Sequence, residues 1–531
     1  MASASVSHSV TIRLELPARP TAVSELTTAM ERVGAIVTAL DVTASGADRL
    51  QVDVTAATHG EDHAEELTEA LRALHGVQIG KVSDRVFLAH LGGKLEIRSK
   101  VPLRTRDDLS LAYTPGVGRV CLAIAANPED ARRLTIKRNT VAVVTDGSAV
   151  LGLGNLGPLA ALPVMEGKAV LFKRFADIDA FPICLDTQDT EEIIAAVKAI
   201  APVFAGINLE DIAAPRCFEI ERRLREELDI PVFHDDQHGT AIVVLAALMN
   251  ALKVVGKDIS TVRLVLSGAG AAGTAVLRLL VAAGLREVVV VDVDGIISRD
   301  RPGLAPELSW TAEHTNPGGM TGSLQDALVD AEVLVGLSAG GILTGADIAT
   351  MAPGPIVFAL ANPTPEVDPA EASTHAAVVA TGRSDFANQI NNVLAFPGVF
   401  RGLIDARTSR VDEVMLLAAA RALAATVHPD QLNATYIVPS VFNTEATTAV
   451  AAAVEKAARG ETAREESARQ DAAPDGAQDE ALDGAAGDGS GPAGAAALGG
   501  EAAREEALSL GGSPTPGEVA AREETAAGNG L

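Results

Sequence analysis

Four carboxylates stand directly after two β-rich runs of the sequence, residues 204–208 and 231–233. They are Glu210 and Asp211 after the first run, and Asp235 and Asp236 after the second. In α/β folds, ligands bind at the carboxyl ends of strands, so we expect these acids to share one site. Clustered carboxylates without a cysteine pair suit a hard divalent cation, so the sequence predicts a site for Mg²⁺ or Mn²⁺.

Three of these acids also have a simpler interpretation. Asp236 could cap the helix that follows it. Glu210 and Asp211 could complement the dipole of a helix in its first turn. His234 and His238 could be ligands, but a histidine in a loop beside acids is more often a hydrogen-bond partner.

A glycine-rich turn joins an apolar strand, residues 262–266, to a predicted helix, residues 274–283. Its glycines are Gly268, Gly270 and Gly273. They let the backbone turn sharply and approach a pyrophosphate at the helix N-terminus. A second strand ends at Asp292, 19 residues after Gly273, where an acid that binds the adenosine ribose is expected. This combination predicts a Rossmann dinucleotide-binding domain.

The charges near Asp292 indicate which dinucleotide binds. A 2′-phosphate requires Arg or Lys close to this strand end. The chain instead places Asp292 and Asp294 there, with Arg299 and Arg301 further on. We therefore expect NAD as the cofactor.

Strand and helix patterns alternate along most of the chain, which predicts an α/β fold. We divide it into an N-terminal domain over residues 1–90, a substrate and metal domain over 91–256, a Rossmann domain over 257–460 and a tail over 461–531. Residues 411–425 and 443–458 are expected to form helices that close the Rossmann domain.

The N-terminal domain has the order βαββαβ, which is the ferredoxin-like plan. Its predicted elements are strands over residues 10–16, 35–43, 50–55 and 77–86 and helices over 20–33 and 63–74. It resembles ACT domains, which bind amino acids or other small effectors. A dimerisation or packing module without a ligand would have the same pattern.

Composition narrows the class of function. The net charge of −27 argues against binding to nucleic acid or to an anionic membrane. We found no apolar run of about 18–20 residues, so no membrane-spanning helix is expected. Three dispersed cysteines argue against disulfides and suit a reducing cytoplasm. The acidic tail, rich in Ala and Gly, cannot bury enough apolar surface to fold and is predicted to be disordered.

Six motifs follow one another along the chain. They are YTPGVG at residues 113–118, TDG at 145–147, LGLGNLG at 151–157, NLED at 208–211, HDDQHGT at 234–240 and NQINN at 388–392. Together they resemble the malic enzymes, and their bacterial branch in particular, over residues 94–458. Malic enzymes oxidatively decarboxylate malate to pyruvate and CO₂, so the resemblance implies this reaction.

The resemblance also implies a role for each matching residue. Tyr113 matches the general acid, Lys168 the catalytic lysine and Asp235 a carboxylate that tunes this lysine. The matching metal ligands are Glu210, Asp211 and Asp236, and Asn362, Asn391 and Asn392 match residues that hold malate or the nicotinamide end of the cofactor. Lys173 competes with Lys168 for the lysine role, and Asn362 could simply begin a turn before its proline.

The chemistry requires these groups. A base must take the C2 hydroxyl proton as hydride leaves, and a lysine can do so if burial or nearby cations lower its pKa. A cation polarises the forming ketone and stabilises the enolate left by CO₂. A tyrosine can then protonate the enolate carbon.

The chain departs from larger members of the family at residues 148–150, which read Ser-Ala-Val where those members carry an arginine for the substrate carboxylate. Two alternatives remain open: decarboxylation of oxaloacetate or malate without net redox, and a metabolite-binding regulator. A homodimer or higher oligomer is expected, with a small effector as a further partner of the N-terminal domain.

Overall fold

The computed structural model describes residues 5–305 and 308–471. The chain divides into two units, Met1–Asp471 and Ala472–Leu531, and the second lies outside the described residues. The predicted tail therefore falls mostly outside them too. Its first residues, 461–471, were predicted to be disordered, and this is wrong. They continue helix α18 (Thr444–Asp471), because Ala, Glu, Arg and Gln all favour helix.

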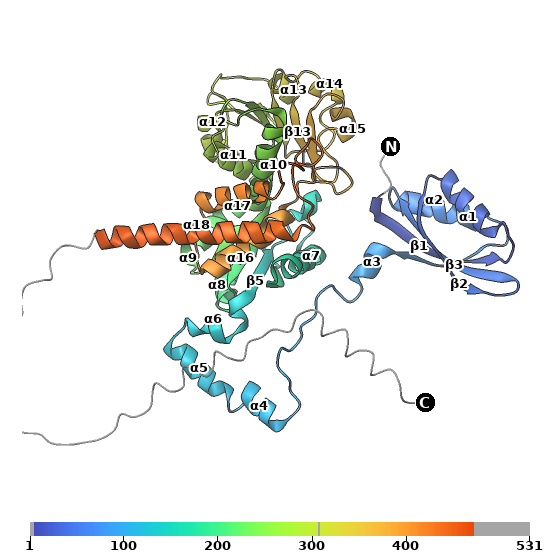
Figure 1. Ribbon diagram of the computed structural model, residues 1–531, viewed down its shortest axis with the longest axis horizontal. Helices are drawn as coiled ribbons and strands as arrows, with labels where there is room; N and C mark the ends of the chain where they lie inside the picture. The colour runs from blue at the N-terminus through green and yellow to red at the C-terminus, as the bar shows by residue number, and fades with distance from the viewer. Residues whose placement is uncertain (1–4, 306–307, 472–531) are drawn as a thin grey trace, which may run out of the picture. The chain divides into compact units, whose positions relative to one another are not determined.

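The N-terminal domain has the predicted βαββαβ order (Figure 1). Its elements are β1 (Ser5–Pro17), α1 (Ala22–Arg32), β2 (Ile36–Ser45), β3 (Arg49–Thr58), α2 (Glu61–Arg72) and β4 (Gln78–Asp84). They form an antiparallel sheet in the order β2-β3-β1-β4. Alternate residues of β1, from Val10 to Leu16, are buried against both helices, as the period-2 pattern requires.

Four short helices and their connections follow: α3 (Arg85–His90), α4 (Arg106–Ala112), α5 (Val117–Ala126) and α6 (Asp130–Leu134). We call residues 96–134 the arm. Its two ends are anchored beyond these bounds. Lys94 donates to the Pro163 carbonyl at 2.7 Å, and Lys137 donates to the Phe204 carbonyl at 2.9 Å. Between these anchors, no residue of the arm is buried.

The first α/β domain is built on a parallel sheet in the order β6-β5-β7-β8. Its strands are β5 (Thr140–Thr145), β6 (Asp179–Cys184), β7 (Gly206–Leu209) and β8 (Val232–His234), and its helices are α7 (Pro158–Ala176), α8 (Thr190–Ile200) and α9 (Arg216–Glu227). All residues of β5 and β7 are buried, as expected for parallel strands covered on both faces.

A second sheet follows in the order β11-β10-β9-β12-β13-β14, parallel except for β11. Its strands are β9 (Arg263–Ser267), β10 (Glu287–Asp292), β11 (Gly295–Ile296), β12 (Val333–Gly336), β13 (Ile356–Ala359) and β14 (Val378–Thr381). Its helices are α11 (Ala271–Ala282), α12 (Ser309–His314), α13 (Leu324–Leu328), α14 (Gly345–Ile348) and α15 (Pro369–Ala372). The strand order reverses between β9 and β12, where a doubly wound sheet binds its ligand.

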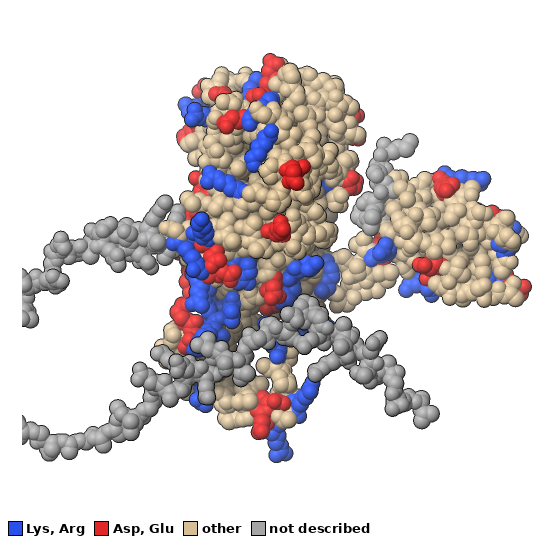
Figure 2. Space-filling view, in the orientation of Figure 1, with Lys and Arg blue, Asp and Glu red and all other residues tan. Residues whose placement is uncertain are grey.

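The long helix α10 (Thr240–Val255) links the two sheets. One hydrophobic core contains residues of both sheets and of α10, together with α16 (Phe396–Ala406), α17 (Glu413–Ala425) and α18. The closing helices predicted over 411–425 and 443–458 correspond to α17 and α18. On the face drawn in Figure 2, acidic and basic side chains are interspersed.

Two helical stretches, Arg106–Ala126 and Asp235–Val255, have the length and mean hydropathy of a membrane span. The sequence prediction that no such stretch exists is therefore wrong. Leu, Val, Ile and Ala keep the mean hydropathy high although polar residues interrupt each run. The second stretch is largely α10 and is mostly buried in the protein core. The first comprises α4 and α5 and is unburied.

Candidate active site

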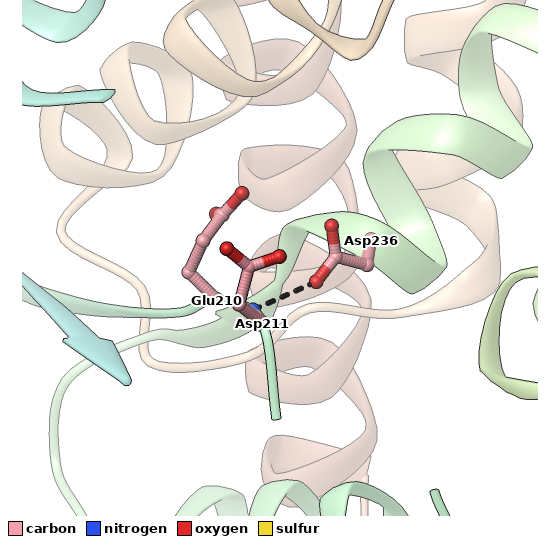
Figure 3. Close-up of side chains that lie close together, drawn as sticks. All are labelled: Glu210, Asp211 and Asp236. Carbon is pink, nitrogen blue, oxygen red and sulfur yellow. Dashed lines mark hydrogen bonds between the residues drawn. The ribbon is translucent and has the colours of Figure 1, made fainter. Parts of the chain in front are cut away.

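Three carboxylates gather where β7 and β8 end (Figure 3). Glu210 and Asp211 follow β7, Asp236 follows β8, and one oxygen from each lies within 4.8 Å of the others. The Asp211 N–H donates to Asp236 Oδ2 at 2.9 Å. Asn208 Nδ2 donates to Glu210 Oε2 at 2.8 Å. The structure thus brings together all three acids implied as metal ligands.

Lys168 reaches this cluster from α7 and is buried. Its Nζ lies 2.6 Å from Asp235 Oδ2 and 2.8 Å from Glu210 Oε1. The same ammonium group lies 4.3 Å from the centre of the Phe396 ring. The competing Lys173, on the same helix, is half exposed and pairs with Asp177 and Asp179 outside the cluster.

Asp235 lies in a single π-helical turn, Asp235–Gly239, between β8 and α10. A Cβ at Gly239 would lie 1.9 Å from Asp235 Oδ1 and 3.3 Å from the Asn392 Cβ. The turn therefore needs glycine, and Asn392 lies at the edge of the cluster. Asn391 accepts a hydrogen bond from the Val393 N–H at 3.0 Å and caps the short turn that follows.

Burial is the largest influence on the acids of the cluster. It raises the pKa of Asp211 to about 7 and that of Asp235 to about 6, and it raises the pKa of Glu210 well above its ordinary range. Burial alone would lower the pKa of Lys168, but the charges of Asp235, Glu210 and Asp236 outweigh it and raise that pKa. A lysine that acts as a base needs a lowered pKa instead. Positive charge bound by the same acids would offset the field that now acts on the ammonium group.

The oxygen atoms of the cluster fit a divalent cation. Asp211 Oδ2, Asp235 Oδ1 and Asn208 Oδ1 are buried and have no hydrogen-bond partner among the described residues. Buried acceptors without donors are costly, and a cation would compensate them. A set consisting only of oxygens favours Mg²⁺ or Mn²⁺ over softer metals.

The glycine turn after β9 has the geometry that its sequence predicts. Gly268 has a φ of +104°, and a Cβ there would lie 2.3 Å from the Leu337 carbonyl oxygen. A Cβ at Gly273 would lie 2.0 Å from the Gly268 carbonyl oxygen, so this glycine allows the close packing of α11 on the strand. Around Gly270 nothing lies within 4 Å of a Cβ. This open side is where a pyrophosphate can approach the backbone.

A groove of about 990 Å³ runs along this turn and is lined by Gly268, Gly270, Asp292 and Asp294. Asp292 ends β10, as predicted, but its carboxylate is already engaged. Arg301 donates to its two oxygens at 2.7 and 2.5 Å. A salt bridge thus stands where the ribose is expected, a feature that the sequence analysis did not include.

Asn362 is exposed just after β13, and its carbonyl oxygen would lie 2.8 Å from a Cβ at Gly152. The loop that contains Gly152 also contacts the cluster, because the Leu151 N–H points to Asp211 Oδ1 at 3.5 Å. Asn362 therefore lies beside the loop that borders the acids. Tyr113 is different: it ends α4 on the arm and is 65% exposed.

Sequence analysis missed one buried residue beside the site, Glu221 of α9. It accepts hydrogen bonds from His238 Nε2 at 2.7 Å and from Gln237 Nε2 at 3.2 Å. The interpretation of His238 as a hydrogen-bond partner is thereby confirmed. The signal was available, because Glu221 shares the apolar face of α9 with Cys217 and Leu224 at helical spacing.

Comparisons with known proteins agree with this geometry. The family described as "Malic enzyme, N-terminal domain" matches residues 92–225, and "Malic enzyme, NAD binding domain" matches residues 237–459. The chain belongs to the malic enzyme family. It is 56% identical over 449 residues to an NAD-dependent malic enzyme of Geobacillus stearothermophilus, covering 85% of this chain and 94% of that one.

Further relatives of the family are similar. A bifunctional malic/malolactic enzyme of Bacillus subtilis is 54% identical, over 69% of this chain and 90% of its own. The crystal structure of an NAD-dependent malic enzyme from Thermotoga maritima has a TM-score of 0.68 at 48% identity, over 70% of this chain and 99% of that one. The family resemblance drawn from the six motifs is therefore confirmed.

Proposed function

We propose that this malic enzyme oxidatively decarboxylates malate to pyruvate and CO₂ and reduces NAD. The observation that carries the proposal is the buried Lys168, paired with Asp235 and Glu210 beside the carboxylate cluster. A buried lysine held by acids next to a cation site is a base positioned for a hydroxyl proton.

Each residue has a defined task. Glu210, Asp211 and Asp236 hold Mg²⁺ or Mn²⁺, which when bound draws electrons from the C2 oxygen and stabilises the charge left by CO₂. Lys168 takes the C2 hydroxyl proton, and Asp235 orients the lysine. Asn362, Asn391 and Asn392 hold malate or the nicotinamide ring, which accepts the hydride. Tyr113 returns a proton to C3.

Gly268, Gly270 and Gly273 hold the pyrophosphate of NAD, and Asp292 faces its ribose. We expect kcat/KM for NAD to exceed that for NADP at least tenfold, since Asp292 and Asp294 repel a 2′-phosphate. Because Asp292 already neutralises Arg301, this arginine contributes little to phosphate binding. The substitution Asp292→Ala would free Arg301 to bind the 2′-phosphate and would therefore reduce the preference for NAD over NADP.

The test is absorbance of NADH with malate, NAD and either Mn²⁺ or Mg²⁺, together with assays for pyruvate and lactate. Lys168→Ala should abolish NADH formation, while Lys173→Ala, on the same helix but exposed, should leave it unchanged. Pyruvate or lactate without net NADH would favour decarboxylation without net redox. No turnover under any of these conditions would overturn the proposal.

We propose that residues 1–90 form a regulatory domain that binds a small effector.

The free cysteines Cys121, Cys184 and Cys217 suit a cytoplasmic enzyme.

A further inference from the structure

Glu366 is a fully buried acid that the proposed mechanism does not use. Its two carboxylate oxygens accept hydrogen bonds from uncharged donors. Oε1 accepts from the Ser338 N–H at 2.8 Å and from the Ser338 hydroxyl at 3.3 Å, and Oε2 accepts from the Ala361 N–H at 3.0 Å. Burial raises the pKa of Glu366 in spite of these bonds. An apolar side chain would fill the same space without the cost of a buried charge, so the hydrogen bonds are what this acid provides.

The donors belong to two different loops at the carboxyl ends of neighbouring strands. Ser338 follows β12 and lines the groove along the glycine turn. Its hydroxyl lies 2.8 Å from the hydroxyl of Ser267, the last residue of β9. Ala361 follows β13 and directly precedes Asn362. The Glu366 carboxylate therefore joins the wall of the groove to the loop that carries Asn362.

Glu366 is itself held through its side chain and its main chain. A Cβ at Gly336 of β12 would lie 2.5 Å from the Glu366 Cδ, so the carboxyl group occupies the space that this glycine leaves. The Glu366 carbonyl oxygen accepts a hydrogen bond from the Leu343 N–H at 2.9 Å. A side chain that is fixed in this way can hold other groups at a set distance.

We propose that Glu366 is a positioning residue for hydride transfer, because it sets the distance between the groove wall at Ser338 and the loop that carries Asn362. The inference rests on the proposed function, in which NAD lies in the groove and Asn362 holds malate or the nicotinamide ring. Hydride transfer needs the reacting atoms about 3–3.5 Å apart, and an error near 1 Å can cost about 100-fold in rate. The carboxylate links the two loops directly and keeps their separation constant.

The test is Glu366→Gln, which keeps the shape of the side chain but leaves only one acceptor oxygen. The amide NH₂ group would face one of the two backbone N–H groups, so one loop should move away. We expect kcat with malate and NAD to fall by about 10- to 100-fold. With malate deuterated at C2, the isotope effect on kcat should be at least as large as in the wild type, because the lost rate lies in hydride transfer.

Glu332→Gln is the matched control. Glu332 stands at the opposite end of β12, accepts a hydrogen bond from the Arg263 N–H at 3.0 Å and pairs with Lys257 at 2.9 Å. It thus also joins neighbouring segments, but away from the groove. Its substitution should lower the melting temperature and leave kcat and the isotope effect unchanged. In Glu366→Gln the affinity for Mn²⁺, from the EPR signal of the ion, should equal that of the wild type, because the carboxylate cluster is untouched.

A second variant, Glu366→Asp, keeps both acceptor oxygens on a side chain that is one carbon shorter. It should recover part of the kcat lost in Glu366→Gln. Unchanged kcat in Glu366→Gln would overturn the proposal, and so would a lower kcat with a smaller isotope effect, which places the loss outside hydride transfer. If circular dichroism shows that neither variant folds, Glu366 supports the fold alone and the proposal is equally overturned. An inactive wild type would instead refute the proposed function.

Discussion

Asp236 provides the clearest test of the cluster, since it is one of three acids and the least buried. Asp236→Ala should reduce turnover by more than about 100-fold, the upper end for residues that merely support a metal ligand. EDTA should mimic the change. Titration with Mn²⁺, followed by the EPR signal of the ion, should show weaker binding to Asp236→Ala than to the wild type. The surface variant Asp430→Ala should bind Mn²⁺ as the wild type does. Unchanged Mn²⁺ affinity would contradict the assignment.

The same substitution should not destabilise the metal-free protein. Glu210 and Asp211 have raised pKa values because they are buried with acid neighbours, Asp236 among them. Removing one negative charge relieves this repulsion, so the thermal midpoint in EDTA should stay equal or rise. A marked fall would mean that Asp236 supports the fold by itself.

Glu221 makes the free energy of unfolding depend on pH, and the direction of this dependence follows from its pKa. Burial by itself would raise its pKa, but His238 and Arg225 outweigh it and hold the pKa at about 2, below the ordinary 4.5. Its stabilisation is thus complete above pH 4.5 and is lost as the pH falls toward 2. The shift corresponds to roughly 3 kcal/mol.

Glu221→Gln should therefore destabilise the protein at pH 7 and flatten the loss of unfolding free energy between pH 5 and 2, measured by urea unfolding. Glu226→Gln, an exposed acid on the same helix, is the matched control and should change neither quantity. An unaltered acid slope in Glu221→Gln would contradict the prediction.

At the scale of elements, α16 contacts α18 through two of its glycines, Gly398 and Gly402. A Cβ at Gly402 would lie 2.5 Å from the Ala451 carbonyl oxygen and 2.8 Å from the Val454 Cβ. Gly402→Ala should lower stability by about 1–3 kcal/mol through overpacking, despite alanine's better helix propensity. Gly460→Ala on α18, with nothing within 4 Å, should be neutral or slightly stabilising. Equal changes in melting temperature for Gly402→Ala and Gly460→Ala would show that α16 and α18 move apart easily to accommodate the added methyl group.

The sequence predicted elements where a simple rule applies. Apolar runs marked β7 and β9, and the glycine spacing marked the turn after β9, because a single conformation satisfies those residues. It predicted no helix over α7, which carries Lys168, since Pro163 stands inside it and apolar residues surround it. The separation of Tyr113 from Lys168 was also unpredicted. Spacing along a chain does not tell how far apart two side chains lie in the folded protein.

At the scale of the molecule, every proposed catalytic residue lies after residue 100, so the N-terminal domain is not needed for chemistry. Deleting residues 1–90 should leave an active enzyme and remove any dependence of malate affinity on effectors. Typical couplings are ~1–3 kcal/mol, or 5–150-fold in affinity. Titration of amino acids and acyl-coenzyme A against both forms checks this. An insoluble truncation, or equal responses, would contradict a regulatory role.

Helix α10 limits where the chain can gain or lose residues without loss of activity. It starts beside Asp236, ends shortly before β9, and is buried along eleven of its residues. At 1.5 Å per residue it is a spacer of about 24 Å between the carboxylate cluster and the glycine turn after β9. One inserted residue would rotate everything beyond it by about 100°, whereas transfer between bound reactants fails on errors near 1 Å. Insertions can therefore accumulate in surface loops, but the length of this helix must stay fixed even where its residue types are free to change.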